Sequence, residues 1–367
     1  MIDLKKLLPS LFSALLLVIS IQPAALAETT SRTESEIKTK VDRLSLEKVI
    51  KLAVEDNHKL TLLTLKQGVL RNTIEDLDED WDDARGSRRN QLDVAIEKVR
   101  TEQKKSVLQR QEAEETIILQ KTGEYTNLLS NIEQINLTKR FLNVLEKDLN
   151  AAKINKVLGT ATNKQIRELA QEIEYKKKDL EVLENNYQLA LSQLSYDLNL
   201  DFSADLVFED IEMKTINRVE RSNNLNEIIA NSFEMERAKE DLLYDKWELD
   251  QDYTDNEYEE SILLENVLIG EETIDQLQTE LMKKADQIYV EVENAYKNYQ
   301  TELLNLTQAK QDYKEIEAKF QLGLVSKHEF EKAYLALQNA ETKVQLTKLT
   351  YFVKKEKIKA MNRGFIQ

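Results

Sequence analysis

The residue types that most often do chemistry in enzymes are scarce in this chain of 367 residues. It contains no cysteine, which excludes a thiolate nucleophile or a thiolate metal ligand. Only His58 and His328 are available as imidazole bases or ligands. The sequence contains no G-x-G-x-x-G, P-loop or H-E-x-x-H pattern. It therefore does not predict an enzyme, and it predicts no cofactor and no metal.

Carboxylates are the remaining side chains that could act as acids and bases. The chain has 67 aspartates and glutamates against 51 lysines and arginines, which gives a formal net charge of −16. Because carboxylates are this frequent, chance pairs are common and do not by themselves predict catalysis. The charge disfavours nucleic acid and an anionic membrane surface as partners. We interpret it as a solvated acidic surface, and the two histidines as ordinary residues of helix surfaces.

Two glycines predict turns rather than chemistry. Gly159 lies in NKVLGTATNKQI (155–166), and Gly323 lies in KFQLGLVSKHEF (319–330). Glycine fits the left-handed position that ends a helix, and a Ser or Thr three residues later can cap the next helix. Both segments then continue as S/T-x-x-E/Q, the capping box that starts a helix. Each glycine is therefore predicted to form the tip of a helical hairpin.

The two tips belong to an internal duplication. When the sequence is aligned with itself on the two glycines, one register without gaps relates 125–187 to 289–351. The segment LSLEKVIKLAVEDNHKL (44–60) also matches NLNEIIANSFEMERAK (224–239), in a different register. A repeat of this length predicts two copies of one hairpin. The pairs in the first register include Tyr125 with Tyr289, Leu142 with Leu306, Leu158 with Leu322, Gly159 with Gly323, and Tyr187 with Tyr351.

The spacing of apolar residues predicts that these hairpins are built from very long helices. The only prolines are Pro9 and Pro23, so none interrupts a helix after that point. Upstream of Gly159, apolar residues recur every three or four positions as a heptad-like stripe. A helix from about Gln91 to Val157 would span on the order of 100 Å. We predict an all-α fold of very long antiparallel helical hairpins in a duplicated coiled-coil arrangement, with little or no β structure.

The segment from Met1 to Ala27 has the pattern of a secretory signal peptide. MIDLKK is a basic n-region, LLPSLFSALLLVISI is an apolar h-region, and Ala25, Leu26 and Ala27 form an A-x-A cleavage site. Cleavage would leave Glu28 at the start of the mature chain, and the alternative is a retained N-terminal anchor. No later run reaches the ~18–20 apolar residues of a transmembrane helix. We expect an exported protein of the cell envelope, periplasmic or associated with the outer membrane.

The same features predict how the chain is divided. Between the two halves the composition changes to short apolar runs such as Leu206, Val207 and Phe208, which favour a connector with a short strand or a short helix. The predicted segments are a signal peptide (1–27), a polar N-terminal segment (28–43), a first helical-hairpin repeat (44–199), the connector (200–222), a second helical-hairpin repeat (223–362) and a tail (363–367).

The duplicated hairpins resemble the TolC family of outer membrane efflux proteins. The residues that carry the resemblance are LSLEKVIKLAVEDNHKL, the tip motifs LGTATNKQI and LGLVSKHEF, and the trailing helices that end near YQLALSQLSYDLNL and YFVKKEKIKAM. Each motif is short, and their order, duplication and spacing give the resemblance its specificity. It covers nearly the whole mature chain.

The resemblance implies a homotrimeric tube that serves as an efflux or export duct. It implies that the hairpin tips bind a periplasmic adaptor, or membrane fusion protein, which links the tube to an inner-membrane transporter in a tripartite pump or a type I secretion system. The implied tip residues are Leu158, Gly159, Thr160, Leu322, Gly323 and Leu324. The residues implied to face the lumen or form a gate are Phe320, Glu329 and Lys332.

The sequence departs from the family pattern at both ends of the hairpins. Lys332 stands where the best-known members have an acidic residue, Phe320 lacks a tyrosine hydroxyl, and Val325 replaces a basic residue. Members that cross the outer membrane insert two β-strands in each half, each of ~9–11 residues. The corresponding segment WDDARGSRRN (81–90) is polar and too short, and 250–270 is acidic with one apolar run that suits helix or strand. The chain resembles the helical tube without its membrane barrel.

A structural role is the competing hypothesis. An exported coiled-coil scaffold or chaperone could be built from the same hairpins without a channel, as a monomer or dimer whose helices close on themselves. The missing strands favour the scaffold. The two tip motifs favour docking to a partner.

Overall fold

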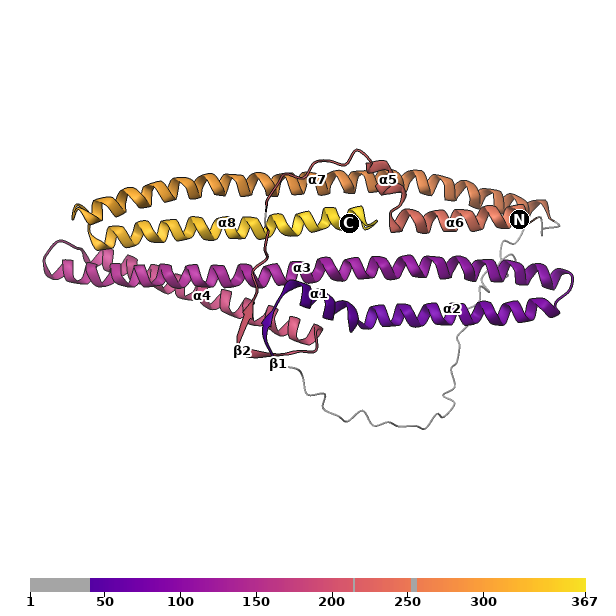
Figure 1. Cartoon of the computed structure of the whole chain (residues 1–367), viewed down its shortest axis with the longest axis horizontal. Helices are drawn as coiled ribbons and strands as arrows, with labels where there is room; N and C mark the ends of the chain where they lie inside the picture. The colour runs from indigo at the N-terminus through magenta and orange to yellow at the C-terminus, as the bar shows by residue number, and fades with distance from the viewer. Residues whose placement is uncertain (1–39, 214, 252–255) are drawn as a thin grey trace, which may run out of the picture. The chain divides into compact units, whose positions relative to one another are not determined.

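The structure, a computed structural model, describes residues 40–213, 215–251 and 256–367, and 84% of it is helical. The predicted fold class of long helices packed in hairpins is confirmed, with one small parallel sheet beside them. Among the described residues, no helix is long and apolar enough to cross a membrane. The helices are α1 (Leu46–Glu55), α2 (His58–Asp83), α3 (Ser87–Val157), α4 (Asn163–Asp197), α5 (Leu225–Ala230), α6 (Phe233–Asp250), α7 (Glu257–Gln321) and α8 (Lys327–Asn362) (Figure 1).

The two longest helices are equivalent members of the duplicated hairpins. α3 has 71 residues and α7 has 65, so each spans on the order of 100 Å. α3 ends at Val157, as predicted, and begins at Ser87, one helical turn before the predicted start. Ala84, Arg85 and Gly86 connect α2 directly with α3. A helix of this length cannot bury itself, so its stability comes from the helices that pack along it.

The packing places the helices in one row. In one half of the row the helices pack in the order α4, α3, α8 and α7. In the other half they pack in the order α2, α3, α6 and α7. The two glycine tips lie at the same end of this row, since Lys147 near the first tip pairs with Glu331 near the second at 2.9 Å. The α2–α3 connection and the start of α7 lie at the opposite end, the far end (Figure 1). α2 and α4 therefore form one edge of the row, and α7 forms the other.

Two hydrophobic clusters hold the middle of the row, and a tyrosine lies fully buried in each. The Tyr125 hydroxyl lies 2.9 Å from the Leu44 carbonyl oxygen and 2.6 Å from that of Glu209. The Tyr351 hydroxyl donates a hydrogen bond to the Asn217 carbonyl oxygen. Because Glu209 and Asn217 belong to the segment between the halves, the two tyrosines fix this connector onto both hairpins.

The only sheet within the described residues has two strands. β1 (Lys40–Leu44) pairs in parallel with β2 (Asp201–Phe208), with Val41 opposite Phe202 and Leu44 opposite Phe208. β2 lies in the predicted connector, for which a strand or a helix was expected. β1 lies in the segment expected to be merely polar. The whole first hairpin separates β1 from its partner in the sequence, so local pattern gives no signal for it.

Candidate docking site at the hairpin tips

The first tip is a tight helical turn around Gly159. The Gly159 N–H donates to the Lys156 carbonyl oxygen at 3.0 Å, and the Thr160 N–H donates to that of Asn155 at 2.8 Å. Gly159 has φ +77°, the left-handed conformation that was predicted. The next helix begins with a complete capping box between Thr162 and Gln165. These contacts satisfy the backbone groups that the two helix ends leave open.

The second tip repeats this geometry between α7 and α8. Gly323 has φ +72°, its N–H donates to the Phe320 carbonyl oxygen at 2.9 Å, and the Leu324 N–H donates to that of Lys319 at 2.9 Å. The capping box of α8 joins Ser326 and Glu329. A Cβ atom placed on either tip glycine would meet no heavy atom within 4 Å. The turns therefore need glycine for its backbone conformation and not for lack of space.

The tips expose leucines. The exposed fractions are 70% for Leu158, 74% for Leu322 and 70% for Leu324. Thr160 is exposed as well. Apolar side chains on a tight turn present a small surface that a helical partner could cover.

Ion pairs join the two hairpins just behind the tips. The Asp148 side chain of α3 is only 13% exposed, and it contacts His328 Nε2 and, at 3.0 Å, Lys332 Nζ, both on α8. The adjacent Lys147 pairs with Glu331, and this contact lowers the pKa of the Glu331 carboxyl. Two cationic side chains thus face one nearly buried carboxylate at the seam between α3 and α8 when His328 is protonated. This arrangement fixes the position of one tip relative to the other.

The structure gives each residue of the implied lumen or gate a partner within the same chain. The Phe320 ring stacks on the Phe330 ring at a centroid distance of 4.8 Å. Glu329 accepts hydrogen bonds from the Ser326 N–H and hydroxyl, and the first of these lowers the pKa of the Glu329 carboxyl. Lys332 pairs with Asp148. The sequence does not mark Asp148 as a site residue, because its partners belong to the other half of the chain and its own helix offers no local signal.

The two histidines differ in their surroundings. His58 is the first residue of α2 and is exposed, as expected for a helix surface. His328 is half-buried against Asp148, so it contributes to the seam between the hairpins. In the described part of the chain, no group of three or more histidines and carboxylates could hold a metal ion.

Two surface hollows lie on either side of Val107 on α3, one beside α2 and one beside α6. Their volumes are about 450 Å³ and 490 Å³. Lys104 borders both and pairs with Glu240 at 2.9 Å, while Lys239 beside the second donates to the Ala230 carbonyl oxygen. Lys104 and Lys239 already bind a carboxylate and a backbone carbonyl, so these hollows do not have the character of a catalytic site.

The arrangement of helices is that of outer membrane channels of known structure. The open-state MtrE outer membrane channel of Neisseria gonorrhoeae matches 88% of this chain and 90% of its own, at 14% identity and a TM-score of 0.67. The Campylobacter jejuni CmeC outer membrane channel matches 88% of this chain and 86% of its own, at 14% identity and a TM-score of 0.61. CusC matches 86% of this chain and 91% of its own, at 13% identity and a TM-score of 0.61. No protein-family model and no curated protein matches the sequence. The resemblance to TolC-family channels is thus confirmed in the fold across most of the chain.

Proposed function

Because this chain shares its fold with outer membrane efflux channels over most of its length, we propose that it is a TolC-like duct component of an efflux or export system. In this proposal it is a homotrimer without enzymatic activity, and its hairpin tips dock a periplasmic adaptor that connects it to an inner-membrane transporter. The observation that carries the proposal is the pair of equivalent apolar tips at one end of the molecule. The contacts of Asp148 with His328 and Lys332 hold these tips together.

The tips suit recognition of a protein partner. Leu158, Leu322 and Leu324 are exposed on two turns of the same geometry, and the capping boxes make these turns rigid. Small rigid surfaces of this kind bind through a few apolar contacts, with surrounding charges contributing less. Phe320, Glu329 and Lys332 lie close behind the second tip, where they would face the lumen of the duct.

Exposed apolar residues along α4 support assembly from several copies. Tyr175, Val182 and Leu189 follow one another at heptad spacing on the face of α4 that is opposite the buried Ile173 and Leu194. A heptad stripe of this kind is the pattern of a helix that packs against another helix. Since α3 already covers the other face of α4, the stripe is available for a second copy of the chain.

The tips can be tested by replacing their glycines. We expect Gly159→Val and Gly323→Val each to reduce co-purification of the adaptor from envelope extracts, because a β-branched residue distorts the left-handed turn at a cost of about 1–2 kcal/mol and enlarges the docking surface. Helix content by circular dichroism should hardly change. Gly86→Val is the matched control, since Gly86 also has a positive φ, of +62°, but lies at the far end.

If the far-end control lowers adaptor recovery as much as the tip variants do, the tips are not the docking site. Recovery of an adaptor with the wild-type chain and the control, and not with the tip variants, supports the proposal. The proposed cleavage between Ala27 and Glu28 lies outside the described residues. It is tested by the mass of the protein recovered from the envelope, and an uncleaved mass contradicts it.

An exported coiled-coil scaffold or chaperone is the second candidate. The observation that favours it is the short connection from Ala84 to Gly86, which joins α2 directly to α3 at the far end. A chain that stays monomeric at micromolar concentration and recovers no adaptor from extracts would favour the scaffold.

A further inference from the structure

The first hairpin tip is cationic and the second is not. Residues 153–168 include four lysines or arginines and one acidic residue, whereas the equivalent residues 317–332 include three lysines and three acidic residues. All four basic side chains of the first tip are exposed. Together they form the cationic surface of this tip, which consists of Lys153, Lys156, Lys164 and Arg167. The two copies of the hairpin thus differ in charge at equivalent positions.

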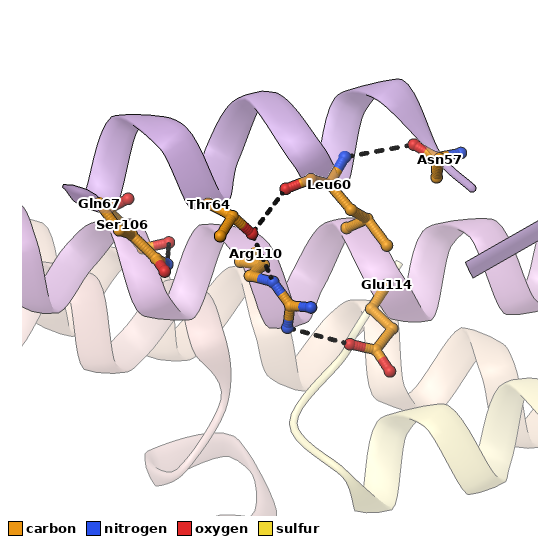
Figure 2. Close-up of polar contacts among 7 residues, drawn as sticks. All are labelled: Asn57, Leu60, Thr64, Gln67, Ser106, Arg110 and Glu114. Carbon is orange, nitrogen blue, oxygen red and sulfur yellow. Dashed lines mark hydrogen bonds and ion pairs between the residues drawn. The ribbon is translucent and has the colours of Figure 1, made fainter. Parts of the chain in front are cut away.

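The cationic surface is free to bind a partner. Three of its four side chains form no ion pair with any described residue, and Lys164 has only a 3.7 Å contact with Glu168. Farther along α3 the situation is different, since Arg110 lies 3.3 Å from the Thr64 hydroxyl of α2 and 3.5 Å from Glu114 (Figure 2). The positive charge at the first tip is therefore not used to hold the helices together.

Exposed aliphatic side chains lie beside the cationic surface. Ile154, Val157 and Leu158 share one face at the end of α3, and they are 63%, 87% and 70% exposed. In the second copy, Ala318 and Gln321 stand at the positions equivalent to Ile154 and Val157. Only the first of the two tips thus combines free cations with three neighbouring aliphatic side chains.

The first tip also extends further than the second. Lys147 pairs with Glu331 at 2.9 Å, so these two residues lie level with each other. Lys147 lies twelve residues before Gly159, whereas Glu331 lies eight residues after Gly323. At ~1.5 Å per residue, the difference of four residues places the first tip about 6 Å beyond the second. The turn between α3 and α4 is accordingly the outermost part of this end of the row (Figure 1).

The acidic charge of the chain lies far from the first tip. In residues 240–272, thirteen acidic residues stand against one basic residue, and the described part of this segment lies towards the far end. α3 separates the two ends by on the order of 100 Å, while electrostatic screening at 0.15 M salt acts over ~8 Å. The net charge of the whole chain disfavours an anionic surface as partner, but it does not act at this tip.

We propose that the first tip binds an anionic phospholipid surface. Ile154, Val157 and Leu158 enter the headgroup region, and the cationic surface contacts lipid phosphates. Lysine suits this partner, because its long side chain reaches the phosphates while the aliphatic residues insert. Protein interfaces are instead depleted in lysine and enriched in aromatic residues, and 150–170 contains no aromatic residue. The inference goes beyond the proposed function and holds equally for a duct and for a scaffold.

Vesicle binding tests the charges. The protein recovered from the envelope should co-sediment at 0.15 M salt with phosphatidylcholine vesicles that contain phosphatidylglycerol, and not with phosphatidylcholine alone. Lys153→Gln combined with Lys156→Gln should weaken this binding roughly 25-fold, since each cation near an anionic surface contributes about fivefold. The matched control is Lys314→Gln combined with Lys327→Gln, which removes two exposed lysines near the second tip and should leave binding nearly unchanged.

A fluorescent label tests the aliphatic residues. Because the chain has no cysteine, Val157→Cys can be labelled alone with a polarity-sensitive dye. The emission of this dye should shift to the blue when the anionic vesicles are added. The matched control is Gln321→Cys, the equivalent position of the second tip, whose label should hardly respond. A label at Val157 that does not respond, or that responds no more than the label at Gln321, overturns the insertion of the first tip.

Recovery of an adaptor separates the lipid contact from the proposed function. A wild-type protein that recovers an adaptor, but binds no vesicles or binds neutral and anionic vesicles equally, contradicts the lipid contact and leaves the proposed function standing. If Lys153→Gln with Lys156→Gln lowers adaptor recovery and not vesicle binding, the cationic surface binds an acidic protein and the lipid contact is wrong. Binding to anionic vesicles that this variant loses and the control keeps supports the lipid contact, whether or not an adaptor is recovered.

Discussion

At the scale of single residues, Asp148 is the side chain on which the relative position of the two tips most depends. It is nearly buried, and it binds His328 and Lys332 from the opposite hairpin. Removing its charge leaves these two side chains at the seam without their carboxylate. We therefore expect Asp148→Ala to lower the free energy of unfolding by roughly 1–3 kcal/mol, measured by urea denaturation at fixed protein concentration.

The neighbouring pair supplies the control for Asp148. Lys147 is half exposed and pairs with Glu331 on α8, so Lys147→Ala should change stability much less. Asp148→Asn keeps the shape and removes the charge, and it should resemble Asp148→Ala if the ion pairs account for the effect. A loss with Lys147→Ala as large as that with Asp148→Ala would show that the seam does not depend on Asp148.

At the scale of elements, the pairing of α7 with α8 should depend on pH. Lys354 of α8, 2.8 Å from Glu291 of α7, holds the pKa of the Glu291 carboxyl below its ordinary value, with further support from Gln287 and Lys357. A carboxyl whose pKa is lowered by folding stabilises the fold above its unfolded pKa of about 4.3. That contribution is lost as the pH falls through the lower pKa of the folded state.

The test compares the free energy of unfolding of Glu291→Gln with that of the wild type at pH 7 and at several lower pH values. At pH 7 the variant should be less stable by up to about 1 kcal/mol, since the pair is partly exposed. The difference should shrink as the pH falls from about 5 towards 3, because the wild-type carboxyl then becomes protonated as well. Glu280→Gln is the control, since Glu280 on the same helix accepts a hydrogen bond from Gln276 and not from a cation. A difference between Glu291→Gln and the wild type that does not vary with pH would contradict the prediction.

At the scale of the whole molecule, the net charge is concentrated in two segments of the sequence whose described residues lie towards the far end. Residues 75–93 contain eight acidic and three basic residues, and residues 240–272 contain thirteen acidic and one basic residue. The acidic excess of these two segments is 17, against a net charge of −16 for the chain, so the rest of the chain is nearly neutral. The acidic surface is therefore unevenly distributed along the helices, with its excess of carboxylates towards the far end.

This uneven distribution predicts a dependence on salt. Repulsion among the carboxylates reaches about 30 Å at 0.01 M salt and only ~8 Å at 0.15 M, so added salt should relieve it. We expect the melting temperature, and the fraction of assembled protein, to rise between these salt concentrations. Replacing Glu259 and Glu260 by Gln should reduce the salt dependence, because both are exposed at the start of α7. A melting temperature that falls as salt is added would instead mean that attractive ion pairs dominate.

The sequence by itself determined the local features of this protein. Both tips follow from Gly159 and Gly323 with their capping boxes, since a left-handed glycine and a Ser or Thr cap act within a few residues of each other. The length of α3 follows from an unbroken apolar periodicity without proline. The duplication that relates the hairpins is also a property of the sequence. These signals are local or repeated, so no knowledge of distant contacts is needed to find them.

Only the tertiary structure decided which residues from separate parts of the chain meet. β1 pairs with a strand from the connector, and Asp148 contacts His328 and Lys332 of the other hairpin. The sequence predicts neither pairing. The sequence also does not show which side of α7 is exposed. In the structure α6 covers one side, and Ile269 lies on the exposed side. A polar or apolar side chain on a long helix can face any neighbour, because periodicity fixes its direction on the helix and not what lies opposite. The order in which the helices pack supplies that information, and it depends on the sum of many weak contacts along the whole row.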